Sequence, residues 1–117
     1  MKTIIAGSRS IKNSALVEQA VRESGFRITE VVSGTAKGVD QMGEDWANKN
    51  NLPIKRFPAE WNKHGKKAGY IRNEQMADYA NALIAIWDGE SKGTKHMIWA
   101  AQLKGLQVYV FRTDTTA

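Results

Sequence analysis

Residues 84–101 read IAIWDGESKGTKHMIWAA and decide the fold class. The stretch begins as an apolar run with strand character, passes through a polar, glycine-containing turn, and continues as an amphipathic segment with helical spacing. A strand that leads through such a turn into a helix is the unit from which parallel sheets are built, because the helix carries the chain back to the start of the next parallel strand.

This unit recurs along the chain. Apolar runs bounded by glycine, proline or polar residues predict strands at residues 2–7, 27–34, 53–57, 82–87 and 106–111. We therefore expect one domain, residues 1–117, with an α/β fold: a small doubly wound, Rossmann-like three-layer sandwich around a five-stranded parallel sheet.

Helices are predicted between the strands from apolar residues at helical spacing and from end signals. The first begins at Asn13 or Ser14 and ends at Gly25, and the last, with Ile98, Ala101 and Leu103 inward, ends at Gly105. Helices are also expected at residues 39–47 and 71–79. Residues 59–67 show neither the helical nor the strand spacing of apolar residues and predict a loop. The tail, residues 112–117, is expected to be frayed.

Composition narrows the class of partner. The 117 residues carry 17 Lys and Arg against 12 Asp and Glu, a net charge of +5, which favours anionic ligands from nucleotides to nucleic acid. The chain has no cysteine, so neither a disulfide framework nor a thiolate metal site is expected. Since neither a signal sequence nor an apolar run of membrane-spanning length is visible, we expect a soluble cytoplasmic protein with no membrane partner.

Three predicted strands end in residues that suit phosphate. Ligands of doubly wound sheets bind outside the carboxyl ends of the strands, where glycine lets the backbone approach and helix N-termini attract anions. The candidates after the three strands are Gly7, Ser8 and Arg9; Ser33, Gly34, Thr35, Gly38 and Asp40; and Asp88, Gly89, Gly93 and Thr94. Each turn alone is equally typical of ordinary turn chemistry, Asp40 also suits a helix cap, and Asp88 also suits a turn brace.

A second candidate group lies in residues 60–76, EWNKHGKKAGYIRNEQM. Trp61 either packs on the domain or stacks on a base, and Asn73 either fixes a turn or binds base or sugar. Lys67 and Arg72 suit phosphate, and Gly69 permits a close approach. His64 and His96 have no ligand partners at metal-site spacing, so we expect no metal site and no required cofactor.

These motifs resemble a known superfamily. The stretches AGSRS, VVSGTAKGVD, AEWNKHGKKAGYIRNEQMA and IAIWDGESKGTKHMI look like the SLOG superfamily of Rossmann-like nucleotide-binding domains, most closely its YspA-type branch. That superfamily is similar in layout to the DNA-processing protein A family and to the Lonely-guy phosphoribohydrolases. The resemblance implies strand order 3-2-1-4-5 and a nucleotide-type ligand across the glycine turns. It implies a pocket lined by Gly7, Ser8, Arg9, Ser33, Gly34, Gly38, Asp40, Arg72, Asn73, Asp88, Gly93 and Thr94.

One departure argues against catalysis. The Lonely-guy resemblance implies an arginine, which Arg72 matches, and a glutamate just after the glycine-threonine turn. This chain has Lys95, His96 and Met97 there. Cleavage of a glycosidic bond requires a carboxylate beside the sugar. The remaining candidates for an acid or base are Glu60, Glu74, Asp88 and Glu90.

Three functions are consistent with the sequence. The first is a nucleotide-binding sensor or sequestering module, expected to be a homodimer with Met97 and Trp99 as interface candidates, although both also suit a core. The second is a nucleoside-phosphate hydrolase or N-glycosidase that uses the same pocket. The third is a DNA- or RNA-binding protein, suggested by the basic charge and by the likeness to DNA-processing protein A.

Overall fold

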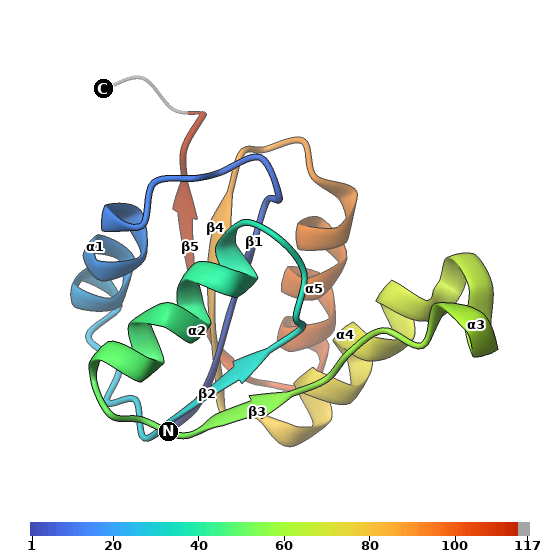
Figure 1. Cartoon of the computed structure of the whole chain (residues 1–117), viewed down its shortest axis with the longest axis horizontal. Helices are drawn as coiled ribbons and strands as arrows, with labels where there is room; N and C mark the ends of the chain where they lie inside the picture. The colour runs from blue at the N-terminus through green and yellow to red at the C-terminus, as the bar shows by residue number, and fades with distance from the viewer. Residues whose placement is uncertain (115–117) are drawn as a thin grey trace.

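The computed structural model describes residues 1–114 and shows an α/β sandwich (Figure 1). Five parallel strands form one sheet with the order β3-β2-β1-β4-β5, which confirms the fold and strand order expected above. The strands are β1 (Lys2–Gly7), β2 (Glu30–Ser33), β3 (Ile54–Arg56), β4 (Ala82–Trp87) and β5 (Gln107–Arg112). The helices are α1 (Ala15–Ser24), α2 (Val39–Lys49), α3 (Trp61–His64), α4 (Ala68–Tyr79) and α5 (Lys92–Leu103), with a 3-10 turn, η1 (Gly65–Lys67), before α4.

Strand periodicity divides the core into two halves. Successive side chains of a strand point to opposite faces of the sheet, so neighbours in the central strands enter different layers. Ile4 of β1 and Leu83 of β4 pack on the side of α4 and α5, whereas Ile5 and Ile84 pack on the side of α1 and α2. Because both faces are covered, residues 3–6 of β1 and residues 82–86 of β4 are all buried, and all but Thr3 are apolar.

The expected loop at residues 59–67 is wrong in detail. Residues 61–64 form α3 and residues 65–67 form η1, and α4 begins at Ala68 rather than at residue 71. This excursion projects from the body of the domain beside the start of α4 (Figure 1). Single helical turns are too short to show an apolar period, which is why the sequence pattern does not reveal them.

Two apolar positions of α5 differ from expectation. Leu103, expected to point inward, is 65% exposed, and Met97, an interface candidate, is buried in the core. The tail also departs from the frayed prediction as far as it is described. Arg112 ends β5, and the amide of Thr113 donates to the carbonyl of Trp87 at 2.9 Å. Residues 115–117 lie outside the described part of the chain.

No helix within residues 1–114 combines the length and the apolar character needed to cross a membrane.

Candidate functional site

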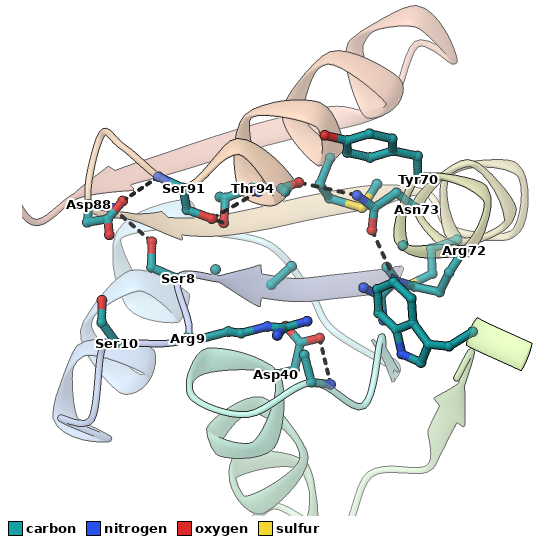
Figure 2. A pocket seen from close by; sticks show the side chains of 18 of the residues that line it. Ser8, Arg9, Ser10, Asp40, Tyr70, Arg72, Asn73, Asp88, Ser91 and Thr94 are labelled. Atoms are coloured by element: carbon teal, nitrogen blue, oxygen red, sulfur yellow. Dashed lines mark hydrogen bonds between the residues drawn. The ribbon is translucent and has the colours of Figure 1, made fainter. Parts of the chain in front are cut away.

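A cavity of about 480 Å³ opens at the carboxyl ends of β1 and β4 (Figure 2). Its walls come from the turn after β1, the start of α2, the α3–α4 excursion and the turn between β4 and α5. This is the edge at which doubly wound sheets bind ligands. Of the residues expected at the site, the structure brings together Gly7, Ser8, Arg9, Asp40, Trp61, Gly69, Arg72, Asn73, Asp88, Gly93 and Thr94.

Residues 33–35, at the end of β2 and in the turn that follows, support the cavity without lining it. Ser33 accepts from the amide of Thr35 at 3.1 Å and donates to buried Glu44 at 2.6 Å. The carbonyl of Gly34 accepts a hydrogen bond from Nη1 of Arg72. Ser33, Gly34 and Thr35 lie outside the lining. The Ser33 hydroxyl, the Thr35 amide and the Gly34 carbonyl are bonded within the protein instead.

Gly38 allows two turns to meet. Its φ is +77°, and a Cβ atom at this position would lie 2.6 Å from the carbonyl oxygen of Arg9. Only glycine combines that conformation with that close approach. Gly38 thus acts by positioning the turn that carries Arg9 rather than by lining the cavity.

The last two expected residues face elsewhere. Lys67, which was expected in the site, lies outside the lining, whereas its neighbour Lys66 lines the cavity. Gly89, with φ +82°, faces Arg112 and Asp114 at the end of β5.

Sequence reasoning missed several lining residues, of which Ser10, Ala36, Lys66, Tyr70 and Ser91 come from turns and helix starts; Ala6, Met76 and Met97 supply apolar wall. Ser91 had a signal in the sequence, because serine is among the residues preferred at a helix N-cap. Its Oγ accepts from the amide of Thr94 at 3.3 Å. Tyr70 and Lys66 were missed because their segment has no apolar period.

Arg72 and Asn73 form a bonded pair at the head of α4. Nε of Arg72 donates to Oδ1 of Asn73 at 3.1 Å, and Nδ2 of Asn73 donates to the carbonyl of Gly93 at 3.2 Å. Two successive residues of α4 therefore bridge to the turn after β2 and to the first turn of α5. This arrangement fixes the guanidinium of Arg72 at the cavity wall.

Arg9 differs from Arg72 in its surroundings. It is exposed, and among residues 1–114 its side chain has no hydrogen-bond or ion-pair partner. Figure 2 shows it reaching from the turn after β1 toward Asp40. A guanidinium with its five donors uncommitted suits an oxyanion of a ligand.

Asp40 is the buried carboxylate of the cavity, with 5% of its surface exposed. Its Oδ2 accepts from the amide of Ala36 at 3.2 Å. Burial raises the pKa of Asp40 to about 6, against the opposing effects of the Ala36 amide and of Arg72. A carboxyl group with such a pKa in a cleft is a common mark of a functional site.

Asp88 organises the turn between β4 and α5. Its Oδ1 accepts from the amides of Glu90 and Ser91, both at 2.8 Å, and its own amide donates to Oγ of Ser8 at 3.1 Å. The hydrogen bonds from Ser91 and Glu90 hold the pKa of Asp88 below its usual value. Asp88 is therefore a turn brace that also borders the cavity.

Two aromatic side chains stand at the cavity wall. Trp61 of α3 is 51% exposed and Tyr70 of α4 is 44% exposed, and both line the cavity. Exposed rings beside a polar cavity offer a stacking surface for a flat ligand group.

Comparison with known proteins places the chain in a family. The model of the YspA, cpYpsA-related SLOG family matches residues 1–64. The Gene 61 protein of Mycobacterium phage D29 is 34% identical over 119 residues, covering 94% of this chain and 95% of that protein. The chain belongs to the YspA, cpYpsA-related SLOG family.

A solved structure supports the fold of this SLOG chain. DNA processing protein A (DprA) from Streptococcus pneumoniae superposes with a TM-score of 0.75 at 20% identity, over 93% of this chain. The chain spans about half of that protein, 49% of its length. The likeness at this identity concerns the fold alone.

The four carboxylates that the sequence offered as an acid or base are poorly placed for that role. Glu60, Glu74 and Glu90 lie outside the cavity lining, and Asp88 is committed to its turn. Two residues after Thr94 lies His96, whose Nδ1 is 3.2 Å from Nδ2 of Asn73 and whose pKa is lowered by burial. Within the described residues, no group of three acidic, histidine or cysteine side chains could hold a metal ion.

Proposed function

We propose that this chain binds a nucleotide or nucleotide-derived ligand in the cavity and acts as a sensor or sequestering module. One observation carries the proposal. Two guanidinium groups, Arg9 and Arg72, and two exposed rings, Trp61 and Tyr70, line one cavity at the carboxyl ends of the strands. Guanidinium groups suit phosphate, and exposed rings suit a base.

The remaining lining suits a sugar phosphate. Ser8 and Thr94 carry hydroxyl groups, and Asn73 carries an amide at the wall between them and Arg72. Ser8 already accepts from the amide of Asp88, and Thr94 donates to Oγ of Ser91 at 3.0 Å, so the two hydroxyls are held in place before any ligand arrives. Preorganised groups of this kind cost little to order on binding.

Binding without cleavage is favoured by the position of the glutamates that the sequence offered as an acid or base. A hydrolase needs an acid or base beside the bond that breaks, and the glutamates proposed from the sequence lie away from the lining. The hydrolase alternative is therefore an outcome of the test rather than the proposal.

The test is a panel of nucleotides examined by thermal shift and calorimetry, with each mixture then separated by chromatography. A ligand that binds only the folded state stabilises it by about 2.7 kcal/mol at a hundredfold excess over Kd. We expect saturable binding with the ligand recovered intact, and binding weakened by Arg9→Ala. The control is Arg27→Ala, an exposed arginine that lies ahead of β2, away from the cavity. Recovery of a cleaved product would make the protein an enzyme.

A second candidate function is nucleic-acid binding. The α3–η1 excursion carries Lys63, Lys66 and Lys67 beside exposed Trp61, and exposed rings among cations are typical of single-strand binding surfaces. The fold is shared with a DNA processing protein. Affinity for an oligonucleotide that falls steeply with salt, with weak binding of mononucleotides, would favour this candidate, because counterion release scales with the number of phosphates contacted.

We further propose that the chain forms a homodimer through α4 and α5. Trp99 is 51% exposed and Leu103 is 65% exposed on α5, so an apolar patch remains on this face. A two-fold axis along the groove between α4 and α5 would place α4 of each copy on α5 of the other and would cover this apolar patch.

A further inference from the structure

Asp40 occupies an unusual place for a carboxylate, at the wall of a cavity that also holds two arginines. Its side chain is almost wholly buried and bonds to the amide of Ala36. Within residues 1–114 no ion pair joins it to a cation at 4.0 Å or less. A buried charge without a close partner is costly, so its protonation state responds to whatever binds beside it.

Charged groups face Asp40 from several elements. Arg9 from the turn after β1 and Arg72 from α4 both act on it electrostatically. Glu44, one turn further along α2, accepts hydrogen bonds from Nε of Arg56 at 2.9 Å and from Oγ of Ser33. The other charged side chains of the cavity are Lys66 of η1 and Asp88 after β4.

The charges of the lining set the charge of the best ligand. Three cations, Arg9, Lys66 and Arg72, stand against two carboxylates, Asp40 and Asp88, so the cavity carries one net positive charge when both carboxylates are ionised. A singly charged phosphate group would neutralise it. A doubly charged phosphate would leave an excess negative charge in a partly desolvated site unless one carboxylate took up a proton.

We propose that Asp40 selects the ligand by the charge of its phosphate: the cavity prefers a singly charged phosphodiester and accepts a doubly charged terminal phosphate only together with a proton on Asp40. This inference rests on the proposed nucleotide-binding function and specifies its ligand class. Asp40 rather than Asp88 carries the proton, because Asp88 is held ionised by two backbone amides whereas burial disfavours the charge on Asp40.

The test compares adenosine 5′-monophosphate, a monoester, with 3′,5′-cyclic adenosine monophosphate, a diester. Calorimetry at pH about 5.5 and about 8 places the measurements on either side of the Asp40 titration. We expect the affinity for the monoester to fall at least about tenfold between these values and that for the diester to change by less than about threefold. Asp40→Asn keeps the shape without the charge and leaves the lining with two net positive charges, so we expect its affinity for the monoester no longer to fall between these pH values.

A measurement on the unaltered chain covers the case in which Asp40→Asn does not fold. Calorimetry in two buffers of different ionisation heat near pH 7 gives the protons taken up on binding. We expect net uptake with the monoester and none with the diester, while the ³¹P shift of the bound monoester stays that of a dianion. Monoester binding that is equal or tighter at the higher pH, with no uptake, would overturn the inference and leave the proposed function standing. Absence of binding by both nucleotides at both pH values would overturn the two together.

Discussion

Nη1 of Arg72 on α4 donates a hydrogen bond to the carbonyl oxygen of Gly34 in the turn after β2, 38 residues away in the chain. The same guanidinium donates to Asn73 from Nε. In the sequence, Arg9 and Arg72 look equivalent, as two arginines that suit phosphate. The structure separates them, since Arg72 joins elements of the fold and Arg9 reaches into the cavity from a surface turn.

This difference predicts different effects of removing each arginine. Arg72→Ala leaves the carbonyl of buried Gly34 without its charged donor, and hydrogen bonds to charged groups contribute about 1.5–3 kcal/mol. We therefore expect the free energy of unfolding in urea to fall by about that amount, with ligand binding lost as well. Arg9→Ala is the matched variant, and its unfolding free energy should change by less than about 0.5 kcal/mol. Equal destabilisation by both would contradict the structural role given to Arg72.

Asp40 predicts a pH dependence of stability. Its pKa rises from 3.8 in the unfolded chain to about 6 in the fold, so the folded state holds the proton more tightly. The free energy of unfolding should fall as pH rises from about 4 to about 6 and then level off, by a contribution of roughly 3 kcal/mol.

Asp40→Asn isolates this contribution from the other titrating groups. Its amide oxygen can still accept from Ala36, and it carries no charge to bury. Urea unfolding of both proteins across this range should show the variant gaining stability relative to the parent as pH rises. A difference between the two that is constant with pH would mean that Asp40 titrates normally.

Gly38 and Gly93 allow the effect of an added Cβ atom to be compared at a crowded and at an open glycine. Alanine at Gly38 would be strained at φ +77° and would press on the carbonyl oxygen of Arg9. Alanine at Gly93, near the start of α5, meets no atom within 4 Å. We expect Gly38→Ala to lower the unfolding free energy by more than about 1 kcal/mol, and Gly93→Ala to be neutral or to raise it by up to about 1 kcal/mol. Similar thermal midpoints for the two variants would contradict the close approach at Gly38.

Much of the fold was readable because buried parallel strands have a clear signature. The apolar run of β4 and the turn after it indicated a strand–helix unit, and right-handed crossovers then restrict the topology. The carboxyl ends of parallel strands meet at one edge, so Ser8, Asp88 and Thr94 were expected to lie together, and they do.

Some site residues could not be assigned from the sequence because hydrogen bonds between residues far apart in the chain leave no pattern in it. The Ala36 amide donates to Asp40 and the Gly34 carbonyl accepts from Arg72, so Gly34 supports the cavity instead of lining it. Tyr70 reached the lining because α4 starts three residues earlier than the apolar spacing indicated. Tertiary contacts of this kind override local preference.

The proposed dimer predicts that charge on α5 dissociates it. Leu103→Glu places a carboxylate in the apolar patch at a position that is 65% exposed, so folding should be little affected. Light scattering over a range of concentrations should show a dimer for the parent and a monomer for the variant. Gln107→Glu, an exposed change on β5 outside the proposed face, is the control. A parent chain that stays monomeric at every concentration would exclude this dimer.

Removal of the Trp61 ring should weaken binding of ligands that carry a base and leave other ligands unaffected. Stacking of a base on an aromatic ring contributes about 1–3 kcal/mol. Trp61→Ala should therefore weaken binding of a nucleoside phosphate by about tenfold or more, which corresponds to about 1.4 kcal/mol. Ribose 5-phosphate lacks the base, so its affinity should be the same for parent and variant when both ligands are titrated by calorimetry. Because Trp61 is 51% exposed, its removal should leave the thermal midpoint close to that of the parent. An equal loss for both ligands would place Trp61 beside the phosphate, next to Arg72, and would move the base to Tyr70 on the same wall of the cavity.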